Sequence, residues 1–306
     1  MIDAPRLSLR VLITGASGFA GRHLAAACAA AGDDVTGISR SGETRVDLLD
    51  AEAAGDIVGA SRPDVVYHLA ARAHVGESWR DPAATLHDNV AMTLNVLEAV
   101  RVHAPEATVV AVGSGEVYGP PAQLPVTETA PLRPQNPYAV SKASADLLAG
   151  FYTDAHGLRV IRARAFNHAG PGQAPTYAIA SFAQQVARAV DAGEDPIRIV
   201  TGNPDTRRDY TDVRDVARAY RLLAARAEPG IYNICSGRTA STTELVGALA
   251  EAAGAELQHE IDPALLRTHE VMELRGSYDA LREATGWEPQ IPLEQTLSDA
   301  LAWWRA

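Results

Sequence analysis

A glycine-rich turn constrains the fold of this chain more than any other feature. The stretch VLITGASGFAGRHL places Gly15, Gly18 and Gly21 between an apolar run (10–15) and a helix-like run (21–31). Glycines at such a turn let the backbone approach a pyrophosphate, whose charge the free amides of a helix N-terminus favour. The GxxGxxG spacing is one residue longer than GxGxxG, and an ordinary strand–helix turn is the alternative. The pattern predicts a dinucleotide site formed by Gly15, Ser17, Gly18, Phe19, Ala20 and Gly21.

Apolar runs alternate with helix-like runs over the first two-thirds of the chain. This alternation is typical of a parallel sheet with helices on both faces, so we predict an α/β fold with a Rossmann-type doubly wound parallel sheet. After Asn167 the Gly/Pro-rich loop HAGPGQAPTY changes the pattern and predicts a smaller α/β C-terminal lobe. The predicted domains are a nucleotide-binding domain at 1–167, rejoined by about 209–236, and a substrate-binding lobe at 168–208 and 237–306. Further predicted strands cover 34–39, 64–70, 108–114 and 159–166, and predicted helices cover 85–103, 137–156, 178–192, 213–226 and 242–253. Apolar residues at helical spacing predict one apolar stripe on the helix at 85–103, and they are Leu86, Val90, Leu94, Leu97 and Val100. Ser241 and Glu244 predict a capping box for the helix at 242–253.

The end of the second predicted strand indicates which dinucleotide binds. An NAD site usually has an acidic residue there to bind the ribose hydroxyls. This chain has Ser39, Arg40 and Ser41 instead, and Arg40 can pair with a 2′-phosphate. A solvated surface arginine is the alternative. We therefore predict NADP(H) as the preferred cofactor, with NAD(H) possible.

The heptapeptide NPYAVSK (136–142) contains Lys142, the only lysine among the 27 basic residues. Asn136 is a good N-cap and Pro137 suits the first helical position, so Tyr138 and Lys142 lie at i and i+4 on one helix face. A nearby ammonium lowers the pKa of a phenol from about 10. We therefore predict that Tyr138 is a general acid or base, although a surface Tyr–Lys pair is the alternative.

Ser114 and Glu116 follow the strand-like run TVVAVGS. Side chains two apart on an extended chain point the same way, so a hydroxyl and a carboxylate face one cleft at the ligand-binding edge of the predicted sheet. A strand-end turn with a solvated Glu116 is the alternative.

Charge and composition exclude several classes of protein. The net charge of −11 argues against binding of nucleic acid. Cys28 and Cys235 are expected to be free thiols, and the scattered histidines predict no metal site. The N-terminal MIDAPRLSLR has no apolar signal core and no run of apolar residues is long enough to span a membrane. We therefore expect a soluble, cytoplasmic protein with no membrane partner.

The glycine turn, the strand-end serine and YxxxK, in this order, resemble the extended short-chain dehydrogenase/reductase family over nearly the whole chain. The resemblance implies that Ser114, Tyr138 and Lys142 form a catalytic triad. It also implies that Leu69, Ala70 and Ala71 lie along the cofactor, and that Asp47 and Leu48 lie at its adenine.

Several stretches resemble the GDP-mannose branch of that family, in particular its 4-keto-6-deoxy-sugar reductases. These are VGSGEVYG (112–119), FNHAGPGQ (166–173), RRDYTDVRD (207–215), RTHEVMELRGS (267–277) and ATGWEPQIPLEQTL (284–297). The resemblance implies a GDP-linked sugar substrate bound by His74, Ser114, Asn167, Arg208 and Glu270. A homodimer is also expected from it, with the helix at 85–103 and the helix that begins at Pro137 as its interface.

Three functions follow from these patterns. A reductase transfers hydride to the C4 keto group of a nucleotide-linked 4-keto-6-deoxy sugar while Tyr138 supplies the proton. A redox-neutral 4,6-dehydratase or 4-epimerase is the second function. The Ser114-Gly115-Glu116 sequence lacks the Asp-Glu pair usual after the serine or threonine in related dehydratases, although Glu116 could still act as a C5 base. A non-enzymatic NADP-binding regulator is the third, and it has no need of an activated phenol.

Overall fold

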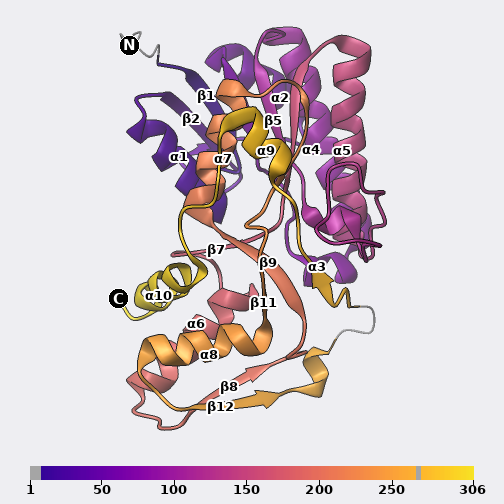
Figure 1. The fold of residues 1–306 in the computed structure, drawn as a ribbon. Helices are drawn as coiled ribbons and strands as arrows, with labels where there is room; N and C mark the ends of the chain where they lie inside the picture. The colour runs from indigo at the N-terminus through magenta and orange to yellow at the C-terminus, as the bar shows by residue number, and fades with distance from the viewer. Residues whose placement is uncertain (1–7, 267–269) are drawn as a thin grey trace.

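Seven parallel strands form the large sheet of the computed structural model, which describes residues 8–266 and 270–306 (Figure 1). Their order is β10-β6-β5-β4-β1-β2-β3, which confirms the predicted doubly wound sheet. The chain order reverses between β1 and β4, and ligands bind at such a point in doubly wound folds. The strands are β1 Arg10–Thr14, β2 Asp34–Ser39, β3 Thr44–Arg45, β4 Val65–His68, β5 Thr108–Val112, β6 Arg159–Ala165 and β10 Gly230–Ile234.

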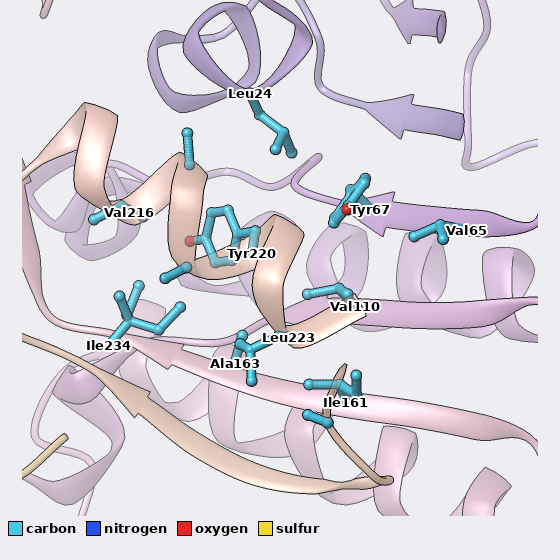
Figure 2. Close-up of a cluster of buried hydrophobic side chains, with 14 of the residues drawn as sticks. Leu24, Val65, Tyr67, Val110, Ile161, Ala163, Val216, Tyr220, Leu223 and Ile234 are labelled. Carbon is cyan, nitrogen blue, oxygen red and sulfur yellow. The ribbon is translucent and has the colours of Figure 1, made fainter. Parts of the chain in front are cut away.

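Helices cover both faces of this sheet. Helices α1 and α7 pack on one face, where Leu24 and Tyr220 meet side chains of the central strands (Figure 2). Helices α2, α4 and α5 pack on the other face through Val58, Val96 and Tyr152. The bounds are α1 Phe19–Ala30, α2 Ala51–Ser61, α4 Pro82–His103, α5 Pro137–His156 and α7 Val213–Arg226, with the short α3 Val75–Arg80 and the 3₁₀ turn η1 Gly115–Tyr118 beside them.

Helix α5 begins and ends where its sequence predicts. The Asn136 side chain accepts a hydrogen bond of 2.8 Å from the amide of Ala139, and Pro137 occupies the first turn. The helix ends at Gly157, whose φ of 69° favours glycine because other residues are strained there. The capping box of Ser241 and Glu244 at the start of α8 is also present.

The smaller lobe lies below the sheet in Figure 1 and has its own apolar core, which includes Ile179, Ile199 and Leu249. It contains two small sheets. Strand β8 pairs with β12, and β9 pairs with β7, β11 and β13. The elements are β7 Asn167–Ala169, α6 Ala178–Asp191, β8 Ile197–Thr201, β9 Arg207–Asp212, β11 Thr239–Ser241, α8 Thr242–Ala253, β12 Leu257–Ile261, η2 Pro263–Leu265, β13 Glu273–Leu274 and α10 Leu293–Trp304.

Two details differ from the sequence predictions. Helix α9 (Asp279–Thr285) falls in the segment predicted for the smaller lobe, but Leu281 and Trp287 are fully buried in the core of the main lobe, against α7. The predicted apolar stripe of α4 is split, because Leu97 and Val100 are buried whereas Leu86 and Leu94 are 41% and 39% exposed. The packed face of α4 combines apolar side chains such as Val96 with polar ones such as Asn89, which donates a hydrogen bond to Ser141 on α5.

Candidate active site

A cavity of about 490 Å³ lies where the carboxyl-terminal ends of β1, β2, β4, β5 and β6 meet. It brings together most of the residues that the sequence predicts for cofactor and catalysis. These are Gly15, Ser17, Gly18, Phe19, Ala20, Gly21, Ser39, Arg40, Leu48, Leu69, Ala70, Ala71, Ser114, Glu116, Tyr138, Lys142 and Asn167.

The glycine turn leaves space that any other residue would fill. Gly15 has a φ of +70°, and a Cβ there would lie 2.9 Å from the backbone nitrogen of Ala70. A Cβ at Gly21 would lie 2.2 Å from the carbonyl oxygen of Gly15. Helix α1 begins after Gly18 without a side-chain cap and without an acidic residue in its first turn. Its first amides are therefore open to an anionic group, and the turn fits the pyrophosphate of a dinucleotide.

The rim of the cavity beyond β2 fits a 2′-phosphate better than a free ribose hydroxyl. Ser39, Arg40 and Ser41 line it, and Ser41 lies within 3.4 Å of Ser17 through their hydroxyl oxygens. Glu116 is the one carboxylate among the described residues of the lining, and it lies on the opposite side, after β5. Asp47, predicted near adenine, is exposed outside the lining, where its carboxylate accepts a hydrogen bond of 3.0 Å from the amide of Leu49.

Lys142 is held at the end of β5. Its side chain is buried, and its ammonium donates a hydrogen bond of 2.5 Å to the carbonyl oxygen of Val112. Burial lowers the pKa of Lys142 to about 8, and the carboxylate of Asp146, one helical turn further along α5, opposes that shift. Lys142 is therefore an ammonium at neutral pH with a proton that is easier to lose than usual.

The prediction that the Tyr138 pKa is lowered is wrong when only the groups of the protein itself act on it. Burial raises the pKa of Tyr138 above its usual value, and Tyr177 and Glu116 add to the increase, whereas a hydrogen bond with Ser114 opposes it. The ammonium of Lys142 is directed at Val112 and does not offset the loss of hydration. The phenol is therefore protonated at neutral pH, which suits it to act as a general acid.

Ser114 and Glu116 share a turn that is fixed to the start of α5. The Ser114 hydroxyl accepts a hydrogen bond of 3.2 Å from the amide of Glu116. The carboxylate of Glu116 accepts one of 3.2 Å from the side-chain amide of Asn136, the residue that caps α5. The two side chains predicted to face one cleft both line the cavity, and Asn136 sets Glu116 next to Tyr138.

Three of the predicted substrate residues lie outside the wall of this cavity. Arg208 is half-buried on β9, and its guanidinium donates a hydrogen bond of 2.9 Å to the carbonyl oxygen of Arg207. Glu270 accepts one of 3.0 Å from the side chain of Asn203. His74 caps α3 by accepting a hydrogen bond of 3.0 Å from the amide of Glu77. In the stretch RTHEVMELRGS, residues 267–269 lie outside the described residues.

Other lining residues have no role in the sequence predictions. They come from the strand ends and the loops that follow them, from β7 and the loop after it, and from α3, α4 and α7. They comprise Ile38, Ser41, Val46, Ala73, Val75, Met92, Val112, Gly113, Ala165, Phe166, His168, Gln173, Tyr177 and Tyr220. His168 and Gln173 belong to the quoted stretch FNHAGPGQ, so that motif could have identified them. Tyr220 is in the middle of an amphipathic helix and gives no such signal.

The described residues contain neither a candidate metal centre nor a candidate membrane span. No group of three or more histidine, cysteine, aspartate or glutamate side chains in the described ranges could hold a metal ion. Within residues 8–266 and 270–306, no helix is long and apolar enough to cross a membrane.

Comparison with known proteins gives matches along nearly the whole chain. The family model for GDP-mannose 4,6-dehydratase matches residues 12–300. A GDP-6-deoxy-D-mannose reductase of Pseudomonas aeruginosa is 41% identical over 303 residues, which cover 98% of each chain. A UDP-glucose 4-epimerase of Mycolicibacterium smegmatis is 30% identical over 315 aligned positions, covering 97% of this chain and 99% of that one.

Solved structures agree with this assignment. The structure of RMD from Pseudomonas aeruginosa complexed with NADPH has a TM-score of 0.89 and 40% sequence identity, covering 97% of this chain and 99% of that one. The chain therefore belongs to the GDP-mannose 4,6-dehydratase family of extended short-chain dehydrogenases/reductases.

Proposed function

We propose that this protein reduces the C4 keto group of a nucleotide-linked 4-keto-6-deoxy sugar with NADPH. The substrate that fits best is GDP-4-keto-6-deoxy-D-mannose, and the product is a GDP-6-deoxyhexose. One observation carries the proposal: Ser114, Tyr138 and Lys142 line the same cavity as a glycine turn that fits a pyrophosphate. The 41% identity to a GDP-6-deoxy-D-mannose reductase supports the choice of reaction and substrate.

The cofactor site is part of the same proposal. The amides of the first turn of α1 bind the pyrophosphate, and Arg40 pairs with the 2′-phosphate, so NADP(H) is preferred over NAD(H). Lys142 donates hydrogen bonds to the nicotinamide ribose. The relative that is complexed with NADPH supports this preference.

Reduced nicotinamide, when bound, supplies a hydride to C4 of the sugar. Tyr138 gives its phenolic proton to the carbonyl oxygen, and Ser114 donates a hydrogen bond to the same oxygen, so the ketone becomes an alcohol. In the structure the ammonium of Lys142 donates to the carbonyl oxygen of Val112. Turned toward Tyr138 during the reaction, it would stabilise the phenolate that remains and offset part of the cost of forming a charge in a buried place.

The smaller lobe, formed by 168–208 and 237–306 except for α9, binds the nucleotide part of the substrate in this proposal. Arg208 is available because none of the described carboxylates forms an ion pair with it. Its planar guanidinium suits a diphosphate in an acidic protein. Asn167 is at the border between the lobe and the cavity, and Glu270 and His74 complete the predicted set.

A 4,6-dehydratase is the second candidate, because Glu116 lies in the cavity and could remove the C5 proton. Glu116→Gln keeps the size of the side chain and removes the base. A dehydratase should lose nearly all activity, whereas a 4-keto reductase should retain a good fraction. Near-total loss of keto-sugar reduction, with circular dichroism unchanged, would contradict the reductase.

The direct test is a panel of GDP-, UDP- and dTDP-linked 4-keto-6-deoxy sugars. Each is incubated with the protein and NADPH, and the nicotinamide absorbance and the product are followed. We expect stoichiometric NADPH oxidation with the GDP sugar. Turnover of a 4-hydroxy sugar nucleotide without net cofactor oxidation would identify a dehydratase or an epimerase instead.

A homodimer and a cytoplasmic location complete the proposal. Exposed apolar side chains on α4 and α5, namely Leu86, Leu94, Leu147 and Phe151, support a helix-to-helix interface. Both cysteines are free and buried, as expected in a reducing compartment. Sedimentation would measure the mass of the assembly, and a Leu147→Glu variant should dissociate it.

A further inference from the structure

Helix α1 contacts the segment 167–173 at several points, although the two are about 150 positions apart in the chain. The helix begins at the glycine turn of the cofactor site. The segment follows β6 and leads into the smaller lobe, where the nucleotide sugar is proposed to bind. Side chains of α1 therefore connect the glycine turn of the cofactor site to the segment that leads into the proposed sugar-nucleotide site.

Arg22 makes the central contact. One nitrogen of its guanidinium donates a hydrogen bond of 3.2 Å to the carbonyl oxygen of Ser17, within the glycine turn. The other terminal nitrogen donates one of 3.0 Å to the carbonyl oxygen of Gly172. The planar, rigid fork of arginine fixes the separation of its two donors. One side chain therefore sets the distance between the cofactor turn and the segment.

Two neighbours on α1 reinforce the contact. The Nε2 of His23 donates a hydrogen bond of 3.0 Å to the carbonyl oxygen of Pro171. The ring of Phe19 stacks on His168, with centroids 6.0 Å apart and planes 6° apart. His23 meets the same Phe19 ring edge-on at 5.5 Å. The segment is thus held along the first turn of the helix, from Phe19 to His23.

The segment in turn presents side chains to the cavity. Asn167, His168 and Gln173 line it. The side-chain amide of Gln173 donates a hydrogen bond of 2.9 Å to the carbonyl oxygen of His168. Because the two ends of the segment are joined in this way, a displacement at Gly172 also moves the lining side chains.

We propose that Arg22 is a positioning residue that couples the two sites, so that bound NADP(H) tightens the binding of the sugar nucleotide; this inference rests on the proposed function. A pyrophosphate on the first turn of α1 orders the turn around Ser17, and the ordered turn fixes the guanidinium. The segment 167–173 then loses less freedom when the second ligand binds, which gives positive cooperativity without a large structural change.

Binding measurements test the coupling. The dissociation constant of GDP is measured by calorimetry with and without saturating NADP⁺, in the wild type and in Arg22→Met. We expect NADP⁺ to lower the constant at least ~5-fold in the wild type, the lower end of typical couplings, and GDP to lower that of NADP⁺ by the same factor. In Arg22→Met both factors should fall to about one, whatever happens to the affinity for NADP⁺ alone.

A second readout follows the segment itself. NADP⁺ alone should slow hydrogen exchange of the amides of 168–173 in the wild type and leave it unchanged in Arg22→Met. Arg198→Met is the matched control, because Arg198 is on β8 and forms an ion pair with Glu260 on the surface. In Arg198→Met, NADP⁺ should lower the dissociation constant of GDP by the same factor as in the wild type. If Arg22→Met does not fold, Arg22→Lys decides, since a single nitrogen replaces the two terminal nitrogens that donate to Ser17 and Gly172, and the factor should be intermediate.

The outcomes separate this inference from the proposed function. GDP that binds with the same constant with and without NADP⁺ would overturn the coupling and leave the function intact. If NADP⁺ lowers the dissociation constant of GDP in Arg22→Met or in Arg22→Lys as much as in the wild type, Arg22 does not transmit the coupling. Absence of binding by GDP, UDP and dTDP under every condition would overturn the function, and the inference with it.

Discussion

The two halves of the binding cleft are assembled in different ways. The cofactor half is completed by the ends of β2 and β4 but consists largely of short continuous stretches, the glycine turn 15–21 and the helix start 136–142. Backbone geometry alone shapes them, through a φ that only glycine favours at Gly15 and a proline at the first position of α5. The sugar-nucleotide half is assembled from strands that are distant in the sequence. Asn167 on β7 and Arg208 on β9, both proposed to bind the sugar nucleotide, lie on two strands that pair with each other, and Asn167 is opposite Tyr210.

The two halves also bind charge differently. Backbone amides at the start of α1, one buried ammonium and the exposed Arg40 are proposed to serve the cofactor half. The other half is proposed to depend on Arg208, whose guanidinium donates a hydrogen bond to the carbonyl oxygen of Arg207. Substitutions in the cofactor half should therefore act on the chemistry or the choice of cofactor, and substitutions on β9 should act on the affinity for the sugar nucleotide.

The largest expected effect is that of Tyr138→Phe. Removing the general acid should lower kcat by at least ~100-fold. The dissociation constant of NADPH, measured by fluorescence, should change little, because the phenol hydroxyl contributes little binding surface. A variant that keeps most of its turnover would show that Tyr138 is not the general acid. It would also contradict the expectation that substitutions in the cofactor half act on the chemistry.

Arg208→Met should raise KM for the sugar nucleotide roughly 30-fold, because a charge-assisted hydrogen bond contributes about 2 kcal/mol. Its neighbour Arg207 is the matched control. Successive strand residues point to opposite sides, and Arg207 forms an ion pair of 3.0 Å with Glu244. Arg207→Met should leave KM unchanged. Equal effects of the two variants would place the diphosphate elsewhere.

Arg40→Ala should weaken NADPH about tenfold and leave NADH nearly unchanged, because only the 2′-phosphate pairs with the guanidinium. The effect is moderate because Arg40 is exposed to water. Arg45→Ala, at an exposed position on β3 outside the cavity lining, is the control. Equal weakening of both cofactors by Arg40→Ala would show that the arginine does not bind the 2′-phosphate.

The same contrast explains what the sequence could predict. Leu69, Ala70 and Ala71, which line the cavity, and Asp47, which does not, follow only from the family resemblance. Local signals predict the strand–turn–helix at Gly15, both ends of α5 and the lining side chains of Arg40, Tyr138 and Lys142. They predicted no strand at Arg207–Asp212, because β9 owes its conformation to three partners far away in the chain. Tyr177 and Tyr220 were missed for a related reason, since only tertiary packing brings them to the cavity.

Packing also accounts for the errors. The apolar residues of α4 lie on two faces of the helix. Polar contacts decide which of the two faces is buried, and the periodicity of the apolar residues does not detect such contacts. The side-chain amide of Asn89 donates a hydrogen bond of 2.8 Å to Ser141 on α5. The Tyr138 pKa was misjudged because spacing gives the distance to Lys142 but not the loss of hydration or the direction of the ammonium.

The smallest expected effect concerns the ionisation of Lys142, and it tests whether burial or the nearby carboxylate controls that residue. Burial favours the neutral amine, so the folded-state pKa of about 8 lies below the usual lysine value. The ammonium that catalysis requires is therefore complete below pH 8 and is lost as pH rises through it. In the free enzyme, kcat/KM should fall about twofold at pH 8 relative to its plateau, because half of the amine is then neutral.

The chain provides a direct measurement of this pKa, because Lys142 is its only lysine. Lysine labelled with ¹³C at Cε should give one protein resonance whose shift titrates near pH 8. In Lys142→Arg the alkaline limb of the pH profile should disappear, since a guanidinium stays charged, even if the maximal rate is lower. A titration above pH 10 would mean that Asp146, bound at 2.7 Å by Arg164, still stabilises the ammonium enough to cancel the cost of burial. The charge of the cofactor half would then depend on a side-chain network behind α5, much as the other half depends on its arginines.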